Sequence, residues 1–464
     1  MNMRAAQAFA VPDVPMTGPR VRSGRSVRII LYCILALIDL FSVLAGFALA
    51  GEIRFGNFIS PRAVQTAAVV LPLYGGLSLM GESYTLDVLK NWRVGAFRAL
   101  RALLFSACAI FLTAFLLKTS HDYSRVLLGA GLVSSAAFIC LGRFLFGRHL
   151  NRRFQGRFVT EALILDEAQI TIPAGVFAID AAAAGIRPDS GDPIMLDRLS
   201  RLLQFADRVV VACPSEREGA WGNLLKGMDV QGEVCMQRFK YTGICGLGKY
   251  AGTPTAVVNA GPLSLTNRFL KRCLDIGLTV PALIFLAPCL LLVALLIKLD
   301  SPGPILFRQQ RMGCGNRLFS VYKFRTMRAD MCDQNGCRSV SREDERVTRL
   351  GHLLRCTSID ELPQLFNVLL GDMSLVGPRP HALGSTVGDD LFWQIDPAYW
   401  HRHTLKPGIT GLAQIKGYRG STQTRTDLTR RLEADLEYVS TWSLGKDLSI
   451  LLRTFGVVIH RNAY

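Results

Sequence analysis

The sequence predicts a membrane-bound, mainly α-helical protein with a small α/β insert in its middle. Apolar runs of bilayer length fill the first third of the 464-residue chain. Short β-like runs alternate with helix-like stretches between about 158 and 260. Only 19% of the residues are charged, whereas soluble proteins usually carry ~25% charged residues. The mean hydropathy of +0.27 agrees with a chain that is short of soluble surface.

Composition also excludes several classes of protein. Half of the residues are hydrophobic, which is enough apolar material for a core and excludes a largely disordered chain. The 12 cysteines are irregularly spaced without a CxxC pair, which excludes a small disulfide scaffold and favours reduced thiols facing a cytosol. No histidine or second cysteine pair follows Cys332 and Cys337 at zinc-ligand spacing, so a zinc site there is disfavoured.

The chain divides into four parts. Residues 1–28 form a flexible basic arm, and 29–157 form a four-helix transmembrane domain. Residues 158–262 form a cytoplasmic insert, and 263–464 form a C-terminal domain. A signal peptide is disfavoured, because the first apolar run is too long and lacks a small-residue cleavage site. Each helix of the membrane domain is expected from one apolar run: 29–50, 63–80, 99–117 and 126–146.

Basic residues predict the orientation of these helices. Arginines and lysines concentrate in the arm, in the second loop and after the fourth helix, whereas the first and third loops are nearly balanced. Both ends of the helical domain are therefore expected on the cytoplasmic side. Asp39 lies inside the first apolar run, and two interpretations are open: a functional residue, or a polar contact between helices, which we favour.

The insert is predicted to be a degenerate Rossmann-like α/β unit with a parallel sheet. Its strands are expected at 162–165, 208–212 and 256–259. A nucleotide-binding version would place G-x-G-x-x-G directly after the first strand, but Asp166-Glu167-Ala168-Gln169 stands there. We therefore expect no cofactor in the insert and a regulatory or oligomeric role.

A fifth apolar run, 276–297, has basic residues on both flanks and two interior prolines, Pro281 and Pro288. The basic flanks place both ends on the cytoplasmic side, and an interior proline bends a helix. A helix that breaks near Ala287–Pro288, enters the inner leaflet and returns satisfies both constraints. The alternative is an ordinary fifth transmembrane helix with kinks.

Basic motifs crowd the last 170 residues. Acids are few around them, which is the electrostatic profile of a site for a polyanion held at a membrane. The motifs are V-Y-K-F-R-T-M at 321–327, D-E-L-P-Q-L at 360–365, G-D-M-S-L-V-G-P-R-P at 371–380 and K-P-G-I-T-G-L-A-Q at 406–414.

Asp360 and Glu361 are adjacent acids among these bases. Ser358 and Glu361 fit an S-x-x-E capping box in front of an apolar helical face, so the simplest interpretation is that the acids cap a helix. The same position also suits phosphate chemistry, because backbone N–H groups at a helix start bind phosphate. One carboxylate could attack phosphorus while its neighbour holds Mg²⁺.

From about 267 to 464 the chain resembles the bacterial sugar transferase family, the monotopic polyprenyl-phosphate hexose-1-phosphate transferases, also called phosphoglycosyl transferases. The four motifs match those of the family in order and spacing. The N-terminal helices and the Rossmann-like insert resemble the long form of the family. The resemblance implies a mostly α-helical, monotopic catalytic domain with a re-entrant helix over 274–299, broken at Pro288.

The resemblance also implies an activity and its residues. Asp360 matches the nucleophile that attacks a UDP-sugar and releases UMP, and Glu361 matches the Mg²⁺ ligand. Undecaprenyl phosphate then accepts the hexose-1-phosphate, in the first membrane step of exopolysaccharide or O-antigen synthesis. The implied sugar is glucose or galactose. Arg379 and Arg355 match phosphate contacts, and Lys323 and Arg325 are weaker candidates for binding the donor phosphates.

The implied partners are the donor, the lipid acceptor and the bilayer, with no nucleic acid; a homo-oligomer is left open. The implied location is the bacterial inner membrane, with the catalytic domain on its cytoplasmic face. A non-catalytic assembly or regulatory partner of polysaccharide export is the alternative function. Leu412 and Cys356 depart from the family's pattern, which commonly has Trp and a base there. For His401 and His403 we favour a solvated or phosphate-facing role over metal binding.

Overall fold

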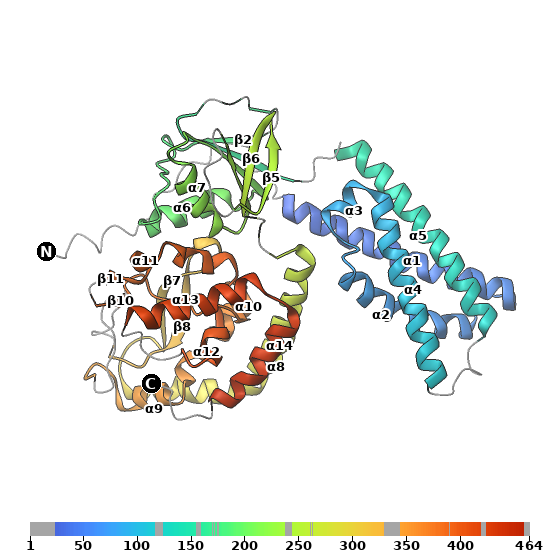
Figure 1. The fold of residues 1–464 in the computed structure, drawn as a ribbon. Helices are drawn as coiled ribbons and strands as arrows, with labels where there is room; N and C mark the ends of the chain where they lie inside the picture. The colour runs from blue at the N-terminus through green and yellow to red at the C-terminus, as the bar shows by residue number, and fades with distance from the viewer. Residues whose placement is uncertain are drawn as a thin grey trace. The chain divides into compact units, whose positions relative to one another are not determined.

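A computed structural model describes residues 24–116, 124–154, 159–168, 170, 172–173, 176–236, 244–259, 261, 263–328, 344–388, 390–418 and 424–458. Most of the basic arm, together with Cys332 and Cys337, lies outside these residues. The described chain forms two compact units (Figure 1). One comprises Arg22–Thr160 with Ser264–Thr266, and the other comprises Glu161–Leu263 with Asn267–Tyr464. The four domain boundaries expected from the sequence stay predictions.

The first unit is helical, and its four long helices are apolar and long enough to cross a membrane. Val43, Phe47, Val70, Tyr74 and Ile139 lie in one buried cluster that joins α1, α2 and α5. Large apolar side chains also cover the outside of the helices, as expected where lipid is the surrounding solvent. The helices are α1 (Gly24–Phe55), α2 (Pro61–Met80), the short α3 (Leu86–Lys90), α4 (Trp92–Leu116) and α5 (Arg125–Phe154).

Asp39 makes the polar contact between helices that the sequence favours. Its fully buried carboxylate accepts hydrogen bonds from Arg143 Nε at 3.0 Å and Nη2 at 2.6 Å, and from the Tyr84 hydroxyl at 3.0 Å. The ion pair therefore joins α1 to α5 inside the helical unit.

The insert contains a six-stranded sheet in the order β2-β1-β3-β4-β6-β5. The three predicted strands exist, and β2, β1, β3 and β4 are parallel to one another. The expectation of a parallel strand at 256–259 is wrong, because β6 pairs antiparallel with both β4 and β5. Here no crossover helix separates β5 from β6; Ala251 and Gly252, both with positive φ, turn the chain straight back. The elements are β1 (Glu161–Leu165), β2 (Phe177–Asp180), α6 (Pro193–Leu203), β3 (Arg208–Ala212), α7 (Glu218–Lys226), β4 (Gln231–Cys235), β5 (Gly246–Tyr250) and β6 (Thr253–Asn259).

The described C-terminal part is mostly helical and contains three two-stranded sheets. In one, β7 and β8 form an antiparallel hairpin; in another, β9 and β12 run parallel. These two sheets bring together segments that carry the basic motifs. The elements are α8 (Leu265–Asp300), β7 (Leu306–Met312), η1 (Cys314–Asn316), β8 (Leu318–Phe324), α9 (Arg349–Cys356), η3 (Ile359–Glu361), α10 (Gln364–Leu370), β9 (Ser374–Val376), β10 (Thr386–Val387), β11 (Asp390–Leu391), α11 (Phe392–Ile395), η4 (Pro397–Thr404), β12 (Gly408–Thr410), α12 (Leu412–Ile415), α13 (Arg425–Ser440) and α14 (Leu444–Val458).

The insert and the C-terminal part share polar contacts and one hydrophobic core. The backbone N–H of Leu318, the first residue of β8, donates to Asp197 of α6 at 2.7 Å. His403 is buried and contacts Asn316 at 2.7 Å, and His401 donates to the Asn223 carbonyl at 3.1 Å. The solvated or phosphate-facing role is wrong for His403, which is buried against Asn316 of its own part. His401 is half-buried and contacts the insert, and its role stays a prediction.

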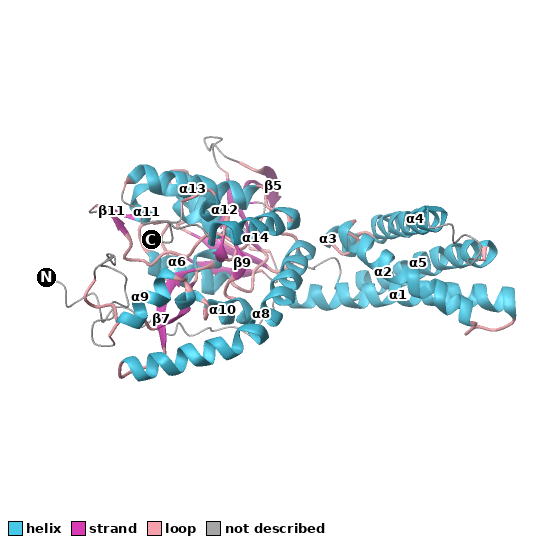
Figure 2. Cartoon of the chain, turned by 90° about the horizontal axis from the view of Figure 1, so that it is seen from below, coloured by secondary structure: helices cyan, strands magenta, loops and turns pink. Residues whose placement is uncertain are grey.

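Helix α8 is 36 residues long and continues through Pro281 and Pro288. Its ribbon changes direction along its length (Figure 2), as expected where a proline removes a backbone hydrogen bond. Many large apolar side chains of its middle are exposed, including Ile284 and Phe285 at 71% and 84%. Near its C-terminal end, Leu290 and Ile297 are instead buried in the cluster that contains Phe324 and Leu354.

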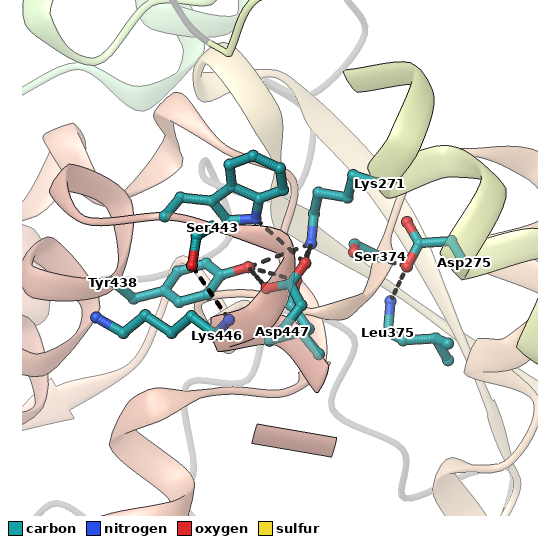
Figure 3. Close-up of polar contacts among 10 residues, drawn as sticks. Lys271, Asp275, Ser374, Leu375, Tyr438, Ser443, Lys446 and Asp447 are labelled. Atoms are coloured by element: carbon teal, nitrogen blue, oxygen red, sulfur yellow. Dashed lines mark hydrogen bonds and ion pairs between the residues drawn. The ribbon is translucent and has the colours of Figure 1, made fainter. Parts of the chain in front are cut away.

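The other end of α8 is fastened to the same C-terminal part (Figure 3). Lys271 Nζ donates to Asp447 Oδ2 at 2.6 Å and to the Val376 carbonyl at 2.9 Å. Asp275 accepts from the Ser374 hydroxyl and from the backbone N–H of Leu375, both at 2.9 Å. Both ends of α8 therefore contact one compact unit.

Candidate active site

The two adjacent acids lie in a single tight turn, η3, in front of α10. The predicted capping box is absent: Ser358 has left-handed backbone angles (φ 56°, ψ 18°) and its side chain does not cap the turn. The reason is the environment of Glu361, whose carboxylate is engaged by cations instead of reaching back to Ser358. A left-handed conformation is rare for a residue other than glycine and is common at functional sites.

Glu361 is the acceptor of a three-residue charge cluster. Lys323 Nζ donates to Glu361 Oε1 at 2.8 Å, and Arg379 donates to Oε1 at 2.5 Å and to Oε2 at 3.1 Å. Burial works against the charge of this carboxylate, but Arg379 and Lys323 outweigh it and hold the pKa of Glu361 well below its usual range. Glu361 therefore stays ionised and orients both cations.

Asp360 is in a different environment, although it is the next residue. Its side chain is buried, and neither a hydrogen bond nor an ion pair joins its carboxylate to another described residue. Burial raises the pKa of Asp360, and the nearby Lys323 offsets this only in part. The turn thus presents one carboxylate that is engaged by two cations and one that has no hydrogen-bond or ion-pair partner among the described residues.

Strand β8 and helix α10 hold Lys323 and the acidic turn in register. Asn367 of α10 is fully buried and accepts from the Tyr322 N–H at 2.9 Å while it donates to the Ser320 carbonyl at 2.7 Å. This side-chain amide therefore replaces a backbone partner along β8. Lys323, one residue beyond Tyr322, is placed opposite Glu361. Burial lowers the pKa of Lys323, and Glu361 counteracts the effect.

Arg379 follows β9 on a loop that two glycines hold against β12. A Cβ atom at Gly377 would lie 2.3 Å from the Lys406 carbonyl oxygen, and one at Gly408 would lie 2.0 Å from the Gly377 nitrogen. The close approach lets Gly377 N–H donate to the Thr410 carbonyl at 2.8 Å. Two of the four motifs therefore meet here, and their glycines are needed for the contact.

Arg355 and Arg325 occupy other positions around the site. Arg355 Nε donates to the Thr326 hydroxyl at 2.8 Å, and its charge acts on the Asp360 carboxyl. Arg325 is buried and donates to the Ser301 and Pro302 carbonyls, just beyond the C-terminal end of α8. The structure thus gathers Asp360, Glu361, Lys323 and Arg379 and puts Arg355 near them. It uses Arg325 to tie β8 to α8, and Pro288 lies within α8.

A second layer of buried charges supports Arg379. Arg402 is 1% exposed; it donates to the Arg379 carbonyl at 2.6 Å and lies 2.7 Å from Asp435. Arg311 donates to the Pro380 carbonyl, and burial lowers the pKa of Arg311 to about 10. Sequence reasoning missed this role of Arg402 and Asp435. A signal exists in retrospect, because Arg431 and Asp435 are one turn apart on the buried face of α13.

Two adjacent carboxylates are also a possible part of a metal site. Among the described residues, no group of three or more His, Cys, Asp or Glu side chains is arranged to hold a metal ion. Mg²⁺, however, is commonly held by one or two carboxylates together with substrate phosphates and water. The pair therefore fits Mg²⁺ only in company with a phosphorylated substrate.

Comparisons with known proteins identify the family of the chain. A family model described as "Bacterial sugar transferase" matches residues 266–461. A UDP-glucose:undecaprenyl-phosphate glucose-1-phosphate transferase of Xanthomonas campestris pv. campestris is 31% identical over 94% of this chain and 95% of its own length. The chain belongs to the bacterial sugar transferase family.

Other relatives match a smaller share of the chain. An undecaprenyl-phosphate glucose phosphotransferase of Komagataeibacter xylinus is 51% identical over 45% of this chain and 39% of its own length. A UDP-glucose:undecaprenyl-phosphate glucose-1-phosphate transferase of Caulobacter vibrioides is 50% identical over 42% of this chain and 72% of its own. The residues of the candidate site all lie within 266–461, the segment that the family model matches.

Proposed function

We propose that the protein transfers hexose-1-phosphate from a UDP-hexose to undecaprenyl phosphate and releases UMP. The names of three relatives favour glucose as the hexose, and galactose is the second candidate. The observation that carries the proposal is the buried Asp360 carboxylate, which has no partner among the described residues, beside a Glu361 that holds two cations. The reaction would be the first membrane step of exopolysaccharide or O-antigen synthesis.

In the first half-reaction an oxygen of Asp360 attacks the β-phosphorus of the donor. The new O–P bond forms as the bond between this phosphorus and the bridging oxygen breaks, and UMP leaves with the electron pair. In the second half-reaction a phosphate oxygen of undecaprenyl phosphate attacks the same phosphorus and frees the carboxylate. A nucleophile that splits one displacement into two in this manner gives ping-pong kinetics.

Arg379 and Lys323 stabilise the negative charge of the transferring phosphoryl group, and Arg355 is a further phosphate contact. The planar guanidinium group suits two parallel hydrogen bonds to phosphate oxygens. Glu361 fixes Lys323 and Arg379 in place before substrate arrives. This lowers the free-energy cost of organising the site. Arg325 stays a weaker candidate for binding the donor phosphates, because its guanidinium already donates to oxygen atoms of Ser301 and Pro302.

We propose Glu361 as the residue that holds Mg²⁺ when the donor is bound. The ion would neutralise charge on the diphosphate. Since Glu361 is already engaged by Lys323 and Arg379, these cations must release part of the carboxylate, and the donor phosphates are their natural new partners.

Helix α8 is proposed to re-enter the inner leaflet rather than to cross the membrane, with its break at Pro288. Lys271 near one end and Ile297 near the other both contact the same compact unit. A helix that crossed the bilayer would place these ends on opposite sides of it. The catalytic part would then lie on the cytoplasmic face, where nucleotide-activated sugars are made.

The N-terminal unit is proposed to be a four-helix transmembrane bundle formed by α1, α2, α4 and α5. The insert is proposed to be a degenerate Rossmann-like unit without a cofactor. Its contacts with the start of β8 support a structural role, because β8 carries Lys323 at its other end. The regulatory or oligomeric role expected from the sequence is the alternative.

Trapping of the covalent intermediate tests the proposal. Purified protein is incubated with UDP-glucose labelled in the sugar, without undecaprenyl phosphate, and then digested and mapped. Label is expected on the peptide that contains Asp360, together with one UMP released per labelled chain. Asp360→Asn should lose both, and Asp372→Asn, an exposed aspartate of a neighbouring motif, should keep both.

Unlabelled wild type that still makes the lipid product would refute the covalent course. A protein inert toward every UDP-hexose would favour the non-catalytic alternative.

A further inference from the structure

A cavity of about 410 Å³ lies at the basic end of the helical unit, away from the candidate active site in the sequence. It is lined by Trp92, Phe144, Arg148, Asn151 and Arg152. All five residues come from α4 and α5. The volume is within the range of ~300–1,000 Å³ that small-molecule sites usually have.

Two walls of the cavity are aromatic and well defined. The rings of Trp92 and Phe144 pack edge to face, with centroids 5.2 Å apart. Gly147 allows this arrangement, because a Cβ atom there would lie 2.8 Å from the Trp92 Cβ. The Arg93 guanidinium lies over the Trp92 ring, 5.9 Å from its centroid. Tryptophan is enriched where a membrane helix meets the headgroup layer.

The remaining wall is cationic, and no ion pair joins it to another described residue. Arg148 and Arg152 are one helical turn apart, and neither makes a hydrogen bond or an ion pair with another described residue. No acid occurs in the last three turns of α5 or in the first turn of α4. Like charges at this spacing repel each other on a helix, so the pair is better accommodated when an anion lies between them.

The cavity also lies where the apolar surface of α5 ends. Leu141 and Leu145 are exposed apolar side chains at 52% and 53%, and beyond the buried Arg143 the exposed basic residues of this end begin at Arg148. A ligand here would meet hydrocarbon on one side and guanidinium groups on the other. Asn151 adds an amide that can donate to or accept from a polar headgroup.

We propose that this cavity binds the phosphate group of an anionic lipid. Arg148 and Arg152 hold the phosphate oxygens, and Trp92 and Phe144 contact the glycerol or the first carbons of the chain. Membrane phospholipid and undecaprenyl phosphate share this chemistry, so either can be the source. The proposal does not depend on the proposed reaction, because it concerns binding to the helical unit alone.

Native mass spectrometry of the delipidated full-length protein tests the site. Phosphatidylglycerol, phosphatidylcholine and undecaprenyl phosphate are added separately, in the absence of any UDP-sugar. The paired variant Arg148→Gln/Arg152→Gln should bind anionic lipid about tenfold more weakly, because two charge-assisted contacts are lost. Arg153→Gln, exposed on the same turn but outside the cavity, is the matched control and should bind like wild type.

The lipid arms identify the source. Loss of phosphatidylglycerol binding in the paired variant assigns the site to membrane phospholipid, and loss of undecaprenyl phosphate binding alone assigns it to the acceptor. Equal binding of every lipid by the paired variant and the control overturns the proposal. If the paired variant does not fold, Arg148→Lys/Arg152→Lys keeps the charge but loses the planar geometry, and should bind about threefold more weakly; unchanged binding there also overturns it.

Discussion

Glu361→Gln removes the carboxylate that separates two cations. The wild-type side chain accepts one hydrogen bond from Lys323 and two from Arg379, and the three side chains are only 20%, 28% and 14% exposed for Lys323, Arg379 and Glu361. Removing one partner of a buried ion pair costs about 3–5 kcal/mol. Because these side chains retain some contact with solvent, we expect the lower end, about 3 kcal/mol.

Thermal unfolding of the purified protein in nanodiscs measures this loss. For a domain of this size, about 3 kcal/mol corresponds to a fall in Tm of roughly 6–12 °C. A second substitution, whose effect on Tm should change sign between the two backgrounds, sharpens the test. Lys323→Met alone should lower the Tm, but in the Glu361→Gln background it removes an unpaired cation and should restore part of the lost stability, by about 1 kcal/mol.

Two results would contradict this reasoning. One is a Tm for Glu361→Gln within the error of the wild-type value. The other is simple additivity of the two substitutions, since a coupling energy near zero means that the charges do not interact. Chelation of Mg²⁺ in the absence of donor should leave all four Tm values unchanged, because the two cations rather than a metal hold Glu361 in the free protein.

Three further predictions concern the same unit. The donor half-reaction should slow as the pH falls through the raised pKa of Asp360, at a higher pH than for an ordinary aspartate, which rapid-quench measurement of UMP checks. A carboxyl group whose pKa is raised in the folded state loses folding stability as the pH rises through that pKa. Asp360→Asn should therefore be inactive but about 1 kcal/mol more stable than wild type near neutral pH. A Tm equal to or lower than that of wild type would contradict this. Gly377→Ala forces its Cβ onto the Lys406 carbonyl, so unfolding should become easier by about 3 kcal/mol and UMP release should fall, whereas a fully active variant would show that the loop relaxes freely. Asp447→Asn leaves Lys271, 7% exposed, without its ion-pair partner and should cost about 3 kcal/mol in thermal unfolding, with Lys446→Gln as the nearly neutral control.

Local patterns in the sequence were sufficient for the helices of the membrane unit. Long apolar runs report burial in lipid directly, so each of the four predicted runs lies in one long helix. The partner of Asp39 could not be found in this manner. Arg143 is 104 residues away, and only the packing of α1 on α5 brings the two side chains together.

The candidate site shows the same division. The spacing of the motifs pointed to Asp360, Glu361, Lys323 and Arg379, which the structure gathers. The capping box failed because two cations from other segments compete for Glu361 more strongly than a backbone N–H does. Arg325 is a comparable case, because its neighbours are carbonyls beyond the end of α8 that no local pattern predicts.

The predicted direction of the strand at 256–259 was wrong for a related reason. Its apolar composition indicates a buried strand, and this is correct. Its direction, however, depends on the connection that precedes it, and a two-residue turn with positive φ at Ala251 and Gly252 permits only a hairpin. Strand direction in the insert is therefore a property of its connections rather than of the strands.

The attachment of α8 at both ends has a consequence for how the protein responds to its membrane. A helix that spans must tilt, or the surrounding lipid must deform, when the hydrocarbon layer becomes thinner or thicker. The re-entrant helix proposed for α8, which is fastened to one folded body through Lys271 at one end and Ile297 at the other, would penetrate to a depth that this body determines. The carboxylate of Asp360, the proposed nucleophile, should therefore keep a constant height above the lipid surface in short-chain and long-chain bilayers alike.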